Sequence, residues 1–215
     1  MITSMCNVME RCYEKNWITT RDGNVSLIRS LEGNIASYMY ISPMGVRKNK
    51  MKPEDIIKVP MSLENVTNNV SIEFHMHHNL LKDAKTTKAI LHCHPVNVVA
   101  AMYAGWNLQE IAAQFPELKR YTKVGPSVDF FEAGSSDLAD QTNINMRGGN
   151  SNGPIQFDIV GQARHGVCAI ANTPWDAYEH VERLDHICEI VLKSGLKPRK
   201  EADEKSTRTM PINCS

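Results

Sequence analysis

The sequence predicts a single α/β domain, and three observations support this fold class. Its 215 residues, 42% of them hydrophobic, are enough to bury one good core. Short apolar runs bounded by Gly, Asn and Asp have the length and the flanking turns of strands. Between these runs lie longer segments in which apolar residues recur at helical spacing. We expect the domain to span residues 1–197 and a polar C-terminal tail to occupy residues 198–215.

The first sixty residues predict one helix followed by three strands. Apolar residues recur at helical spacing from Met5 to Cys12, behind Thr3 and Ser4, which are able to cap a helix. Strands are expected at residues 25–28 and 38–42, paired antiparallel, with a third strand at residues 56–59. Turn signals stand before the first two strands, at residues 21–24 and 32–34.

The middle of the chain predicts a helix, a buried strand and a second helix. Residues 71–82 mix apolar residues with histidines, and Ser71 is expected to be the N-cap, so that Glu73 falls in the first turn. Residues 89–93 form a continuous apolar run typical of a buried strand. Pro95 is well placed as the first residue of the helix that follows.

The C-terminal third predicts a loop, two strands and a long helix. Residues 143–154 are rich in Asn and Gly, which is typical of an exposed loop. Strands are expected at residues 155–160 and 167–171, joined by a tight connection around His165. A helix is expected from Thr173 to residue 194, where Gly195 follows as a stop signal. Its apolar stripe is expected to face the core: Trp175, Tyr178, Val181, Leu184, Cys188 and Val191.

Charge and composition exclude several classes of partner. The chain carries 24 Lys and Arg against 24 Asp and Glu, without the positive excess of nucleic-acid binders or peripheral membrane proteins. It shows neither a signal-peptide region nor about twenty consecutive apolar residues. We therefore expect a cytoplasmic protein with no nucleic-acid and no membrane partner. The six cysteines lack CxxC pairs, and the phosphate-binding GxxxxGK[ST] and dinucleotide GxGxxG patterns are missing, which disfavours thiolate zinc sites and nucleotide-dependent enzymes.

The most informative motif is His92-Cys93-His94. Alternate residues of a strand point to the same face, so the two imidazoles lie side by side and suit one divalent metal ion. Glu73 lies upstream and His165 far downstream, and together the four residues make a three-histidine, one-carboxylate set. This set fits zinc better than calcium or magnesium, which prefer oxygen ligands, although ordinary strand histidines are the alternative.

Other candidate ligands are weaker. Cys93 points to the opposite face of the strand, which argues against a ligand role. His77 follows Glu73 by four residues on the same expected helix face, where it can support the site. The remaining histidines are interpreted as surface or packing residues: His75, His78, His180 and His186.

Read together, five segments resemble the class II aldolase/adducin family in order and spacing, over nearly the whole chain: Gly23-Asn24-Val25-Ser26, Ile41-Ser42-Pro43-Met44-Gly45-Val46, Ser71-Ile72-Glu73, His92-Cys93-His94 and Arg164-His165-Gly166. The family includes fuculose-phosphate and rhamnulose-phosphate aldolases, ribulose-phosphate epimerases and methylthioribulose-phosphate dehydratases. The resemblance implies a three-layer fold with a central, mostly antiparallel sheet flanked by helices. It also implies a homotetramer with active sites at subunit interfaces.

The resemblance further assigns roles to single residues. His92, His94 and His165 match the family's zinc ligands, and Glu73 matches the acidic residue that ligates the empty metal and then acts as acid/base. The positions that hold the substrate phosphate are matched by Gly23, Asn24, Gly45 and Ser71. Tyr121 is the candidate for the catalytic tyrosine that a neighbouring subunit supplies, with a structural tyrosine as the alternative.

Two departures from the family pattern concern the phosphate. Met44 stands where the family often has Thr or Ser, and Ile72 stands where many members have Ser or Ala. Hydroxyl donors to the phosphate are therefore lost, and backbone N–H groups, Arg47 or Lys48 are the candidates to replace them.

The leading hypothesis is an aldolase, dependent on zinc or another divalent metal, that cleaves a small ketose phosphate to a dihydroxyacetone-phosphate-like fragment and an aldehyde. The alternatives are a dehydratase of the methylthioribulose-phosphate type or an epimerase on the same site, and a non-catalytic adducin-like interaction module.

Overall fold

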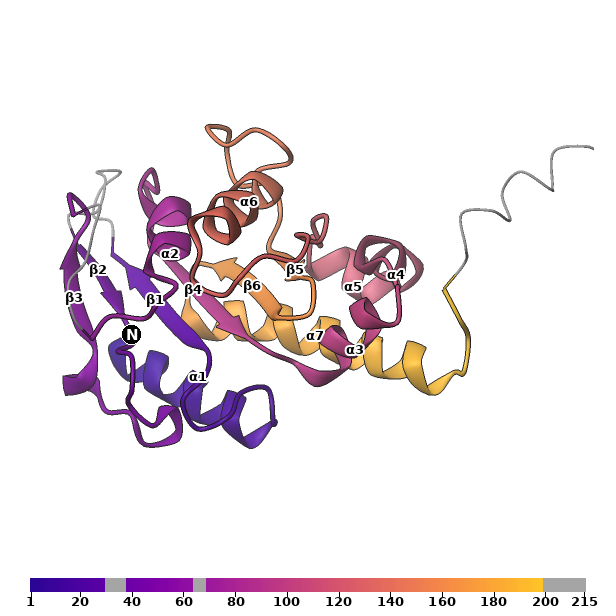
Figure 1. The fold of residues 1–215 in the computed structure, drawn as a ribbon, viewed down its shortest axis with the longest axis horizontal. Coiled ribbons are helices and arrows are strands. Elements are labelled where there is room, and N and C mark those ends of the chain that lie inside the picture. Colours follow the sequence, from indigo (N-terminus) through magenta and orange to yellow (C-terminus); the bar gives the residue numbers. More distant parts are fainter. Residues whose placement is uncertain (30–37, 64–68, 199–215) are drawn as a thin grey trace, which may run out of the picture.

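The computed structural model describes residues 1–29, 38–63 and 69–198. Six strands form one antiparallel sheet in the order β3-β2-β1-β4-β6-β5 (Figure 1). The strands are β1 (Asn24–Ile28), β2 (Tyr38–Ile41), β3 (Ile57–Pro60), β4 (Lys88–Cys93), β5 (Ile159–Gln162) and β6 (Gly166–Ala171). The predicted α/β class with an antiparallel central sheet is confirmed.

Helices cover both faces of the sheet and divide the core into two clusters. One face packs against α1 (Ile2–Glu14), α3 (Val96–Tyr103), α4 (Leu108–Gln114), α5 (Pro116–Tyr121) and α7 (Pro174–Lys193). The other face packs against α2 (Phe74–Leu81) and α6 (Ser136–Met146), so the molecule has three layers (Figure 1). Because successive residues of a strand alternate in direction, Leu91 and Cys93 of β4 belong to the first cluster and Ile90 to the second.

The N-terminal elements lie close to the predicted ranges. β1 and β2 pair antiparallel, with Ser26 opposite Ile41. The first helix begins one turn earlier than expected, with Met1 as its N-cap, so Thr3 and Ser4 are helical residues and not caps. The turn predicted at residues 32–34 lies outside the described residues, as does the tail from residue 199.

The helix expected at residues 71–82 begins later, and this changes the environment of Glu73. α2 starts at Phe74 and Glu73 is its N-cap, although its side chain makes no capping hydrogen bond. Ser71 precedes the N-cap by two residues, and its Oγ accepts a hydrogen bond from the Glu73 N–H at 3.3 Å. The Glu73 carboxylate is therefore free to point away from the helix.

The prediction of an exposed loop at residues 143–154 is wrong for the first part of this segment. α6 extends to Met146, and both Asn143 and Arg147 are buried. Hydrogen bonds of Arg147 account for this burial, since its Nε donates to Asn143 Oδ1 at 2.8 Å and its Nη1 donates to the Gly153 carbonyl. The polar side chains that suggested a loop thus satisfy one another and fold residues 148–153 back onto the helix.

Two smaller differences concern β5 and α7. The strand expected at residues 155–160 is shifted to Ile159–Gln162, because the N–H groups of Gln156 and Phe157 donate to the Met146 carbonyl at the end of α6. In α7, Trp175 is 39% exposed and is not part of the core, whereas the rest of the predicted stripe packs inside. Thr173 caps the helix as expected, accepting from the Asp176 N–H at 3.1 Å.

None of the helices in the described residues is long and apolar enough to cross a membrane.

Gly23, which leads into β1, illustrates how tightly the backbone approaches the sheet. Its φ is +68°, and a Cβ there would lie 2.6 Å from Ile18 Cγ2 and 3.0 Å from the His92 carbonyl oxygen. Gly149 also has a positive φ, +94°, but has open space around it. Comparing substitutions at the two positions therefore separates the strain of a positive φ from the steric clash of an added Cβ.

We expect Gly23→Ala to lower the free energy of unfolding by more than about 2 kcal/mol, because conformational strain adds to the clash. Gly149→Ala should cost about 1 kcal/mol, from the positive φ alone. Urea titrations of both variants measure the difference, and equal losses would mean that the Gly23 site relaxes around the methyl group.

Candidate active site

Several elements bring the predicted site residues together at one end of the central strands of the sheet. His92 lies at the end of β4 and His94 just after it, while His165 lies between β5 and β6 and Glu73 at the start of α2. Asn24 begins β1 directly opposite His92. These residues share one cavity of about 270 Å³, lined by Arg21, Asp22, Gly23, Asn24, Pro43, Met44, Lys48, Ser71, Ile72, Glu73, His92, His94, Ala133 and His165.

The three histidines form a compact cluster in this cavity. One ligand atom from each lies within 4.8 Å of the other two, and the ring centroids are 4.8–5.0 Å apart. His92 Nδ1 lies 3.0 Å from the Val167 carbonyl, to which its N–H donates, so the Nε2 lone pair faces the other imidazoles. His94 is fixed by its backbone N–H, which donates to the Trp17 carbonyl at 2.8 Å.

Burial keeps these imidazoles neutral. It lowers the pKa of His92 well below its usual value, with further lowering by the neighbouring His94 and His165. Burial also lowers the pKa of His94, and it lowers that of His165 to about 4 with a smaller contribution from His94. Neutral imidazoles present lone pairs at physiological pH, which is the state that binds a metal ion.

Glu73 faces the same cluster from the start of α2. Its Oε2 lies 3.1 Å from His92 Nε2 and its Oε1 lies 3.5 Å from His165 Nε2. Asn24 Nδ2 donates to Oε2 at 3.5 Å. Burial raises the pKa of Glu73 to about 7, with a smaller opposing effect of the Asn24 hydrogen bond. A carboxyl group with such a pKa can both give and take a proton at neutral pH.

The donor set fits a transition metal of the zinc type. Three convergent neutral nitrogens with a carboxylate beside them match the ligands and the number that zinc prefers, and they differ from the oxygen shells of calcium and magnesium. Cys93 packs on the opposite face of the sheet with Cys12, so it stays outside the cluster as predicted.

A buried hydrogen-bond chain connects the site to α2. Ser26 Oγ lies 2.6 Å from His77 Nδ1, and His77 Nε2 contacts Asn24 Oδ1. Because Asn24 Nδ2 donates to Glu73, its Oδ1 must accept from His77, which places the His77 proton on Nε2 and makes Nδ1 the acceptor for Ser26. The spacing of Glu73 and His77 in the sequence pointed to His77, but the link between their side chains runs through Asn24.

His77 should make stability depend on pH. It is fully buried, and burial lowers its pKa from 6.5 to about 3. Below pH 6.5 the unfolded chain takes up the proton and the folded chain does not, so the folded state loses about 2 kcal/mol at pH 5 relative to pH 8. Urea titrations at both pH values should show that His77→Gln removes this part of the dependence. His75→Ala, on the half-buried side of the same helix, should leave it intact.

The other predicted residues divide into two groups. Gly23 and Ser71 line the cavity, whereas Gly45 lies in the adjacent turn, with a φ of +77° and its carbonyl accepting from Arg21 Nη1. Tyr121, 54% exposed, lies outside this cavity on α5, and its ring is 5.4 Å from Arg120 and 5.6 Å from Arg183. Sequence reasoning did not place Arg21, Asp22 and Ala133 at the site, because a turn or loop signal does not indicate which side chains line a cavity.

Comparison with known proteins gives one family over most of the chain. The sequence model of the Class II Aldolase and Adducin N-terminal domain matches residues 3–192. The chain is 25% identical to an L-fuculose phosphate aldolase of Methanocaldococcus jannaschii, covering 86% of this chain and 92% of that protein. It is 27% identical to a methylthioribulose-1-phosphate dehydratase of Bradyrhizobium sp., covering 86% and 88%. A sugar-phosphate aldolase structure from Thermotoga maritima superposes with a TM-score of 0.70 at 23% identity, covering 92% and 97%.

Proposed function

Because this chain belongs to the class II aldolase and adducin family, we propose that it is a metal-dependent aldolase that cleaves a small ketose phosphate to a dihydroxyacetone-phosphate-like fragment and an aldehyde. The observation that carries the proposal is the cluster of His92, His94 and His165 with Glu73 beside it in one cavity. Several identified relatives act on sugar phosphates. We also propose that the protein is cytoplasmic.

His92, His94 and His165 are the proposed metal ligands, with Glu73 as a fourth ligand when no substrate is bound. Zinc is the proposed ion because nitrogen donors dominate the set. When bound, the ion supplies a Lewis acid that stabilises negative charge on a substrate oxygen. The neutral imidazoles leave its positive charge undiminished.

Glu73 is the proposed acid/base at the reacting carbon. In the cleavage direction a base removes the hydroxyl proton, the carbon–carbon bond breaks and the aldehyde leaves. The electron pair stays on the other fragment, and protonated Glu73 then delivers its proton to that carbon. Burial raises the pKa of Glu73 to about 7 in the metal-free protein, which makes this carboxyl group better suited than an exposed one to exchanging a proton near neutral pH. Asn24, held by His77, donates to Oε2 and orients the carboxyl group.

The substrate phosphate is proposed to lie beside Gly23, Asn24, Gly45 and Ser71. Gly23 and Ser71 line the cavity, and the positive φ of Gly23 and Gly45 allows the backbone to approach a ligand closely. The side chain of Asn24 already bonds His77 and Glu73, so its contribution to phosphate binding is expected to be the smaller of its two roles.

Tyr121 is the proposed base for the hydroxyl proton, supplied by a neighbouring subunit of a homotetramer. Its exposure and its position outside the cavity of its own protomer are consistent with a role at a second copy. We expect Tyr121→Phe to slow cleavage while metal content stays unchanged, and Tyr103→Phe, 77% exposed, to act as the neutral control.

Co-assembly tests whether Tyr121 acts between subunits. Subunits that carry Tyr121→Phe and subunits that carry Glu73→Gln are each expected to be nearly inactive. Mixed oligomers should recover activity, because some interfaces combine an intact Glu73 with an intact Tyr121. Oligomers whose mixing is verified by mass but whose activity stays low would exclude this arrangement.

Metal analysis combined with a screen of ketose 1-phosphates tests the proposed reaction. Purified protein should hold a divalent ion, and the metal-loaded protein should release a dihydroxyacetone-phosphate-like product from one of the substrates. Protein that binds no divalent metal, or metal-loaded protein that cleaves none of them, would contradict the proposal.

A dehydratase is the second candidate, because one methylthioribulose-1-phosphate dehydratase is 27% identical to this chain, close to the 25% of the aldolase. In this reaction Glu73 would move a proton at the carbon beside the carbonyl while a hydroxyl leaves as water. Loss of water without carbon–carbon cleavage in the same screen favours the dehydratase, and inversion without either favours an epimerase.

A non-catalytic, adducin-like module is the third candidate. The buried imidazole cluster and the raised pKa of Glu73 argue against it, because buried titratable groups are costly to retain without a role. A His94→Ala variant with unchanged assembly, in a protein without activity on the whole panel, would favour the module.

A further inference from the structure

Lys48 is a buried cation in the wall of the active-site cavity. Its side chain is 2% exposed and it begins the short 3₁₀ helix η1 (Lys48–Lys50). Its backbone N–H donates to the Thr20 carbonyl at 2.8 Å, and its Nζ donates to the Pro43 carbonyl. These two bonds hold the ammonium group against the turn that follows β2.

This ammonium group lacks a close carboxylate partner. Among the described residues, none of the ion pairs within 4.0 Å includes Lys48. Asp22 lies in the same cavity wall and acts on Lys48 only from a longer distance, and its own Oδ2 accepts from Thr19 Oγ1. A buried charge that is bonded only to a neutral carbonyl is energetically unfavourable, and such groups are retained mainly at functional sites.

Lys48 nevertheless keeps its charge. Burial lowers its pKa from 10.5 to about 8, which leaves most of the population protonated at pH 7. Arg21 adds a second cation on the other side of the same turn, where its Nη1 donates to the Gly45 carbonyl. Two cations thus face one carboxylate, Asp22, in this part of the wall.

The turn between Pro43 and Gly45 offers little else to an anion. Met44 and Ile72 are 51% and 56% exposed and carry no hydroxyl group. The backbone N–H of Met44 already donates to the Asn69 carbonyl at 2.7 Å. Beyond the Ser71 hydroxyl and the glycine backbone, positive charge from outside the turn is therefore available to attract an anionic group.

We propose that Lys48, assisted by Arg21, binds the phosphate of the substrate at the turn formed by Pro43, Met44 and Gly45. Lys48 replaces, with a full charge, the hydroxyl donors missing at Met44 and Ile72. The assignment makes Lys48 the residue that selects phosphorylated over neutral substrates. Its relevance to turnover depends on the proposed function, but the binding of phosphate does not.

Binding of inorganic phosphate to the metal-loaded protein, measured by calorimetry, tests the proposal. Lys48→Met keeps the aliphatic length and removes the charge, and we expect it to weaken phosphate binding about tenfold or more. Lys48→Arg should retain part of the affinity. Lys50→Met is the matched control, since it makes the same change at an exposed position of the same 3₁₀ helix, and it should bind phosphate as the wild type does.

Thermal unfolding without phosphate distinguishes a binding residue from a structural one. If Lys48 serves a ligand, Lys48→Met removes an unpaired buried charge and the Tm should stay the same or rise. A clear fall in Tm would identify Lys48 as structural and overturn the proposal. The metal content of Lys48→Met should equal that of the wild type.

Three further results would overturn the proposal: wild-type protein that does not bind phosphate, Lys48→Met that binds it equally well, or acetate that binds more tightly than phosphate. The proposed function can fail separately. Phosphate binding that depends on Lys48, in a protein that converts no ketose phosphate, would leave the anion site intact and remove the aldolase. Turnover of a ketose phosphate with an unchanged KM in Lys48→Met would support the aldolase and contradict the role of Lys48 in phosphate binding.

Discussion

Replacement of His94 by alanine is expected to weaken zinc binding by more than about 100-fold and to abolish turnover, because loss of a ligand exceeds the 10- to 100-fold effect of losing its supporting contacts. Only two imidazoles would remain in the cluster. The fold should persist, since His94 is half-buried beyond the end of β4 and its bond to the Trp17 carbonyl uses the backbone N–H, which alanine retains.

Metal content after dialysis and a competitive zinc titration measure this effect. His186→Ala is the matched control, since His186 is exposed on α7 and should not affect metal binding. Retention of zinc by His94→Ala at the wild-type affinity would show that the metal is held elsewhere. It would also remove the basis for the proposed chemistry.

Replacement of Glu73 by glutamine is expected to lower kcat by about 10²- to 10⁴-fold, the usual contribution of a general acid/base. Glutamine has nearly the same shape but cannot exchange a proton. Glu73 is 4% exposed and burial raises its pKa to about 7, so a neutral side chain there should leave the folded state equally or more stable. The three histidines should still hold the metal ion.

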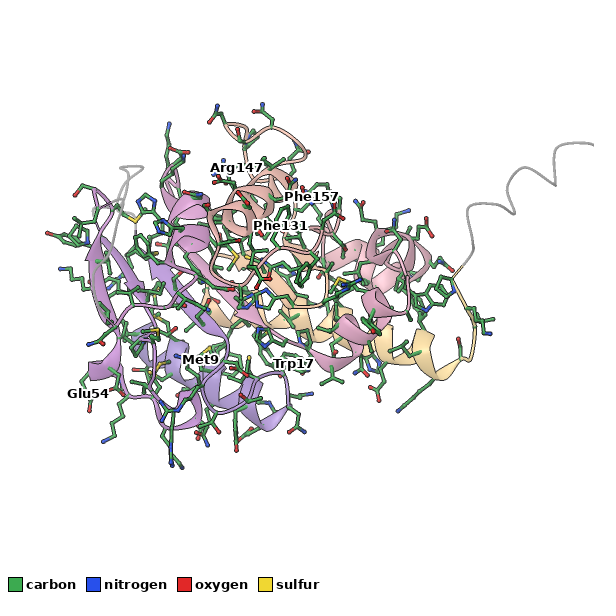
Figure 2. All side chains as sticks on the ribbon, in the orientation of Figure 1. Met9, Trp17, Glu54, Phe131, Arg147 and Phe157 are labelled. Atoms are coloured by element: carbon green, nitrogen blue, oxygen red, sulfur yellow. The ribbon has the colours of Figure 1, made fainter. Side chains whose placement is uncertain are left out.

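Two measurements separate proton transfer from metal binding. Exchange of the carbon-bound proton of dihydroxyacetone phosphate with deuterated water should fall together with cleavage, while metal content stays at the wild-type level. Glu54→Gln is the matched control, because Glu54 is exposed at the edge of the molecule (Figure 2) and should change neither. Normal exchange in Glu73→Gln with full metal content would assign the acid/base role to another residue.

The elements that sequence reasoning predicted well are those with strong local signals. β1, β2 and β4 are short apolar runs with turns around them, and α7 begins at a Thr-Pro cap and ends before a glycine, Gly195, with a positive φ of +73°. The sequence at the end of α6 is polar and was therefore interpreted as a loop. Asn143 and Arg147 can be buried there because they are satisfied by each other and by the chain that follows. No local pattern distinguishes such a buried polar pair from a loop.

The same division applies to the site. The alternation of strand residues was enough to place His92 and His94 on one face and Cys93 on the other, and the HxH motif lies at the end of β4 as expected. The sequence also pointed to Glu73 and His165, but the short distances between them depend on the sheet order, which brings β1, β4 and β6 together.

By itself, the sequence determined the fold class, the antiparallel pair at its start and the residues able to bind a metal, because strand alternation, turn chemistry and side-chain type are local properties. Only the tertiary structure decided that Glu73 caps α2 without using its carboxylate, that Asn24 links it to His77, and that Lys48 is buried in the cavity wall. These features depend on contacts between segments separated by tens of residues, and burial, which sets the pKa of each group, exists only once the layers have packed.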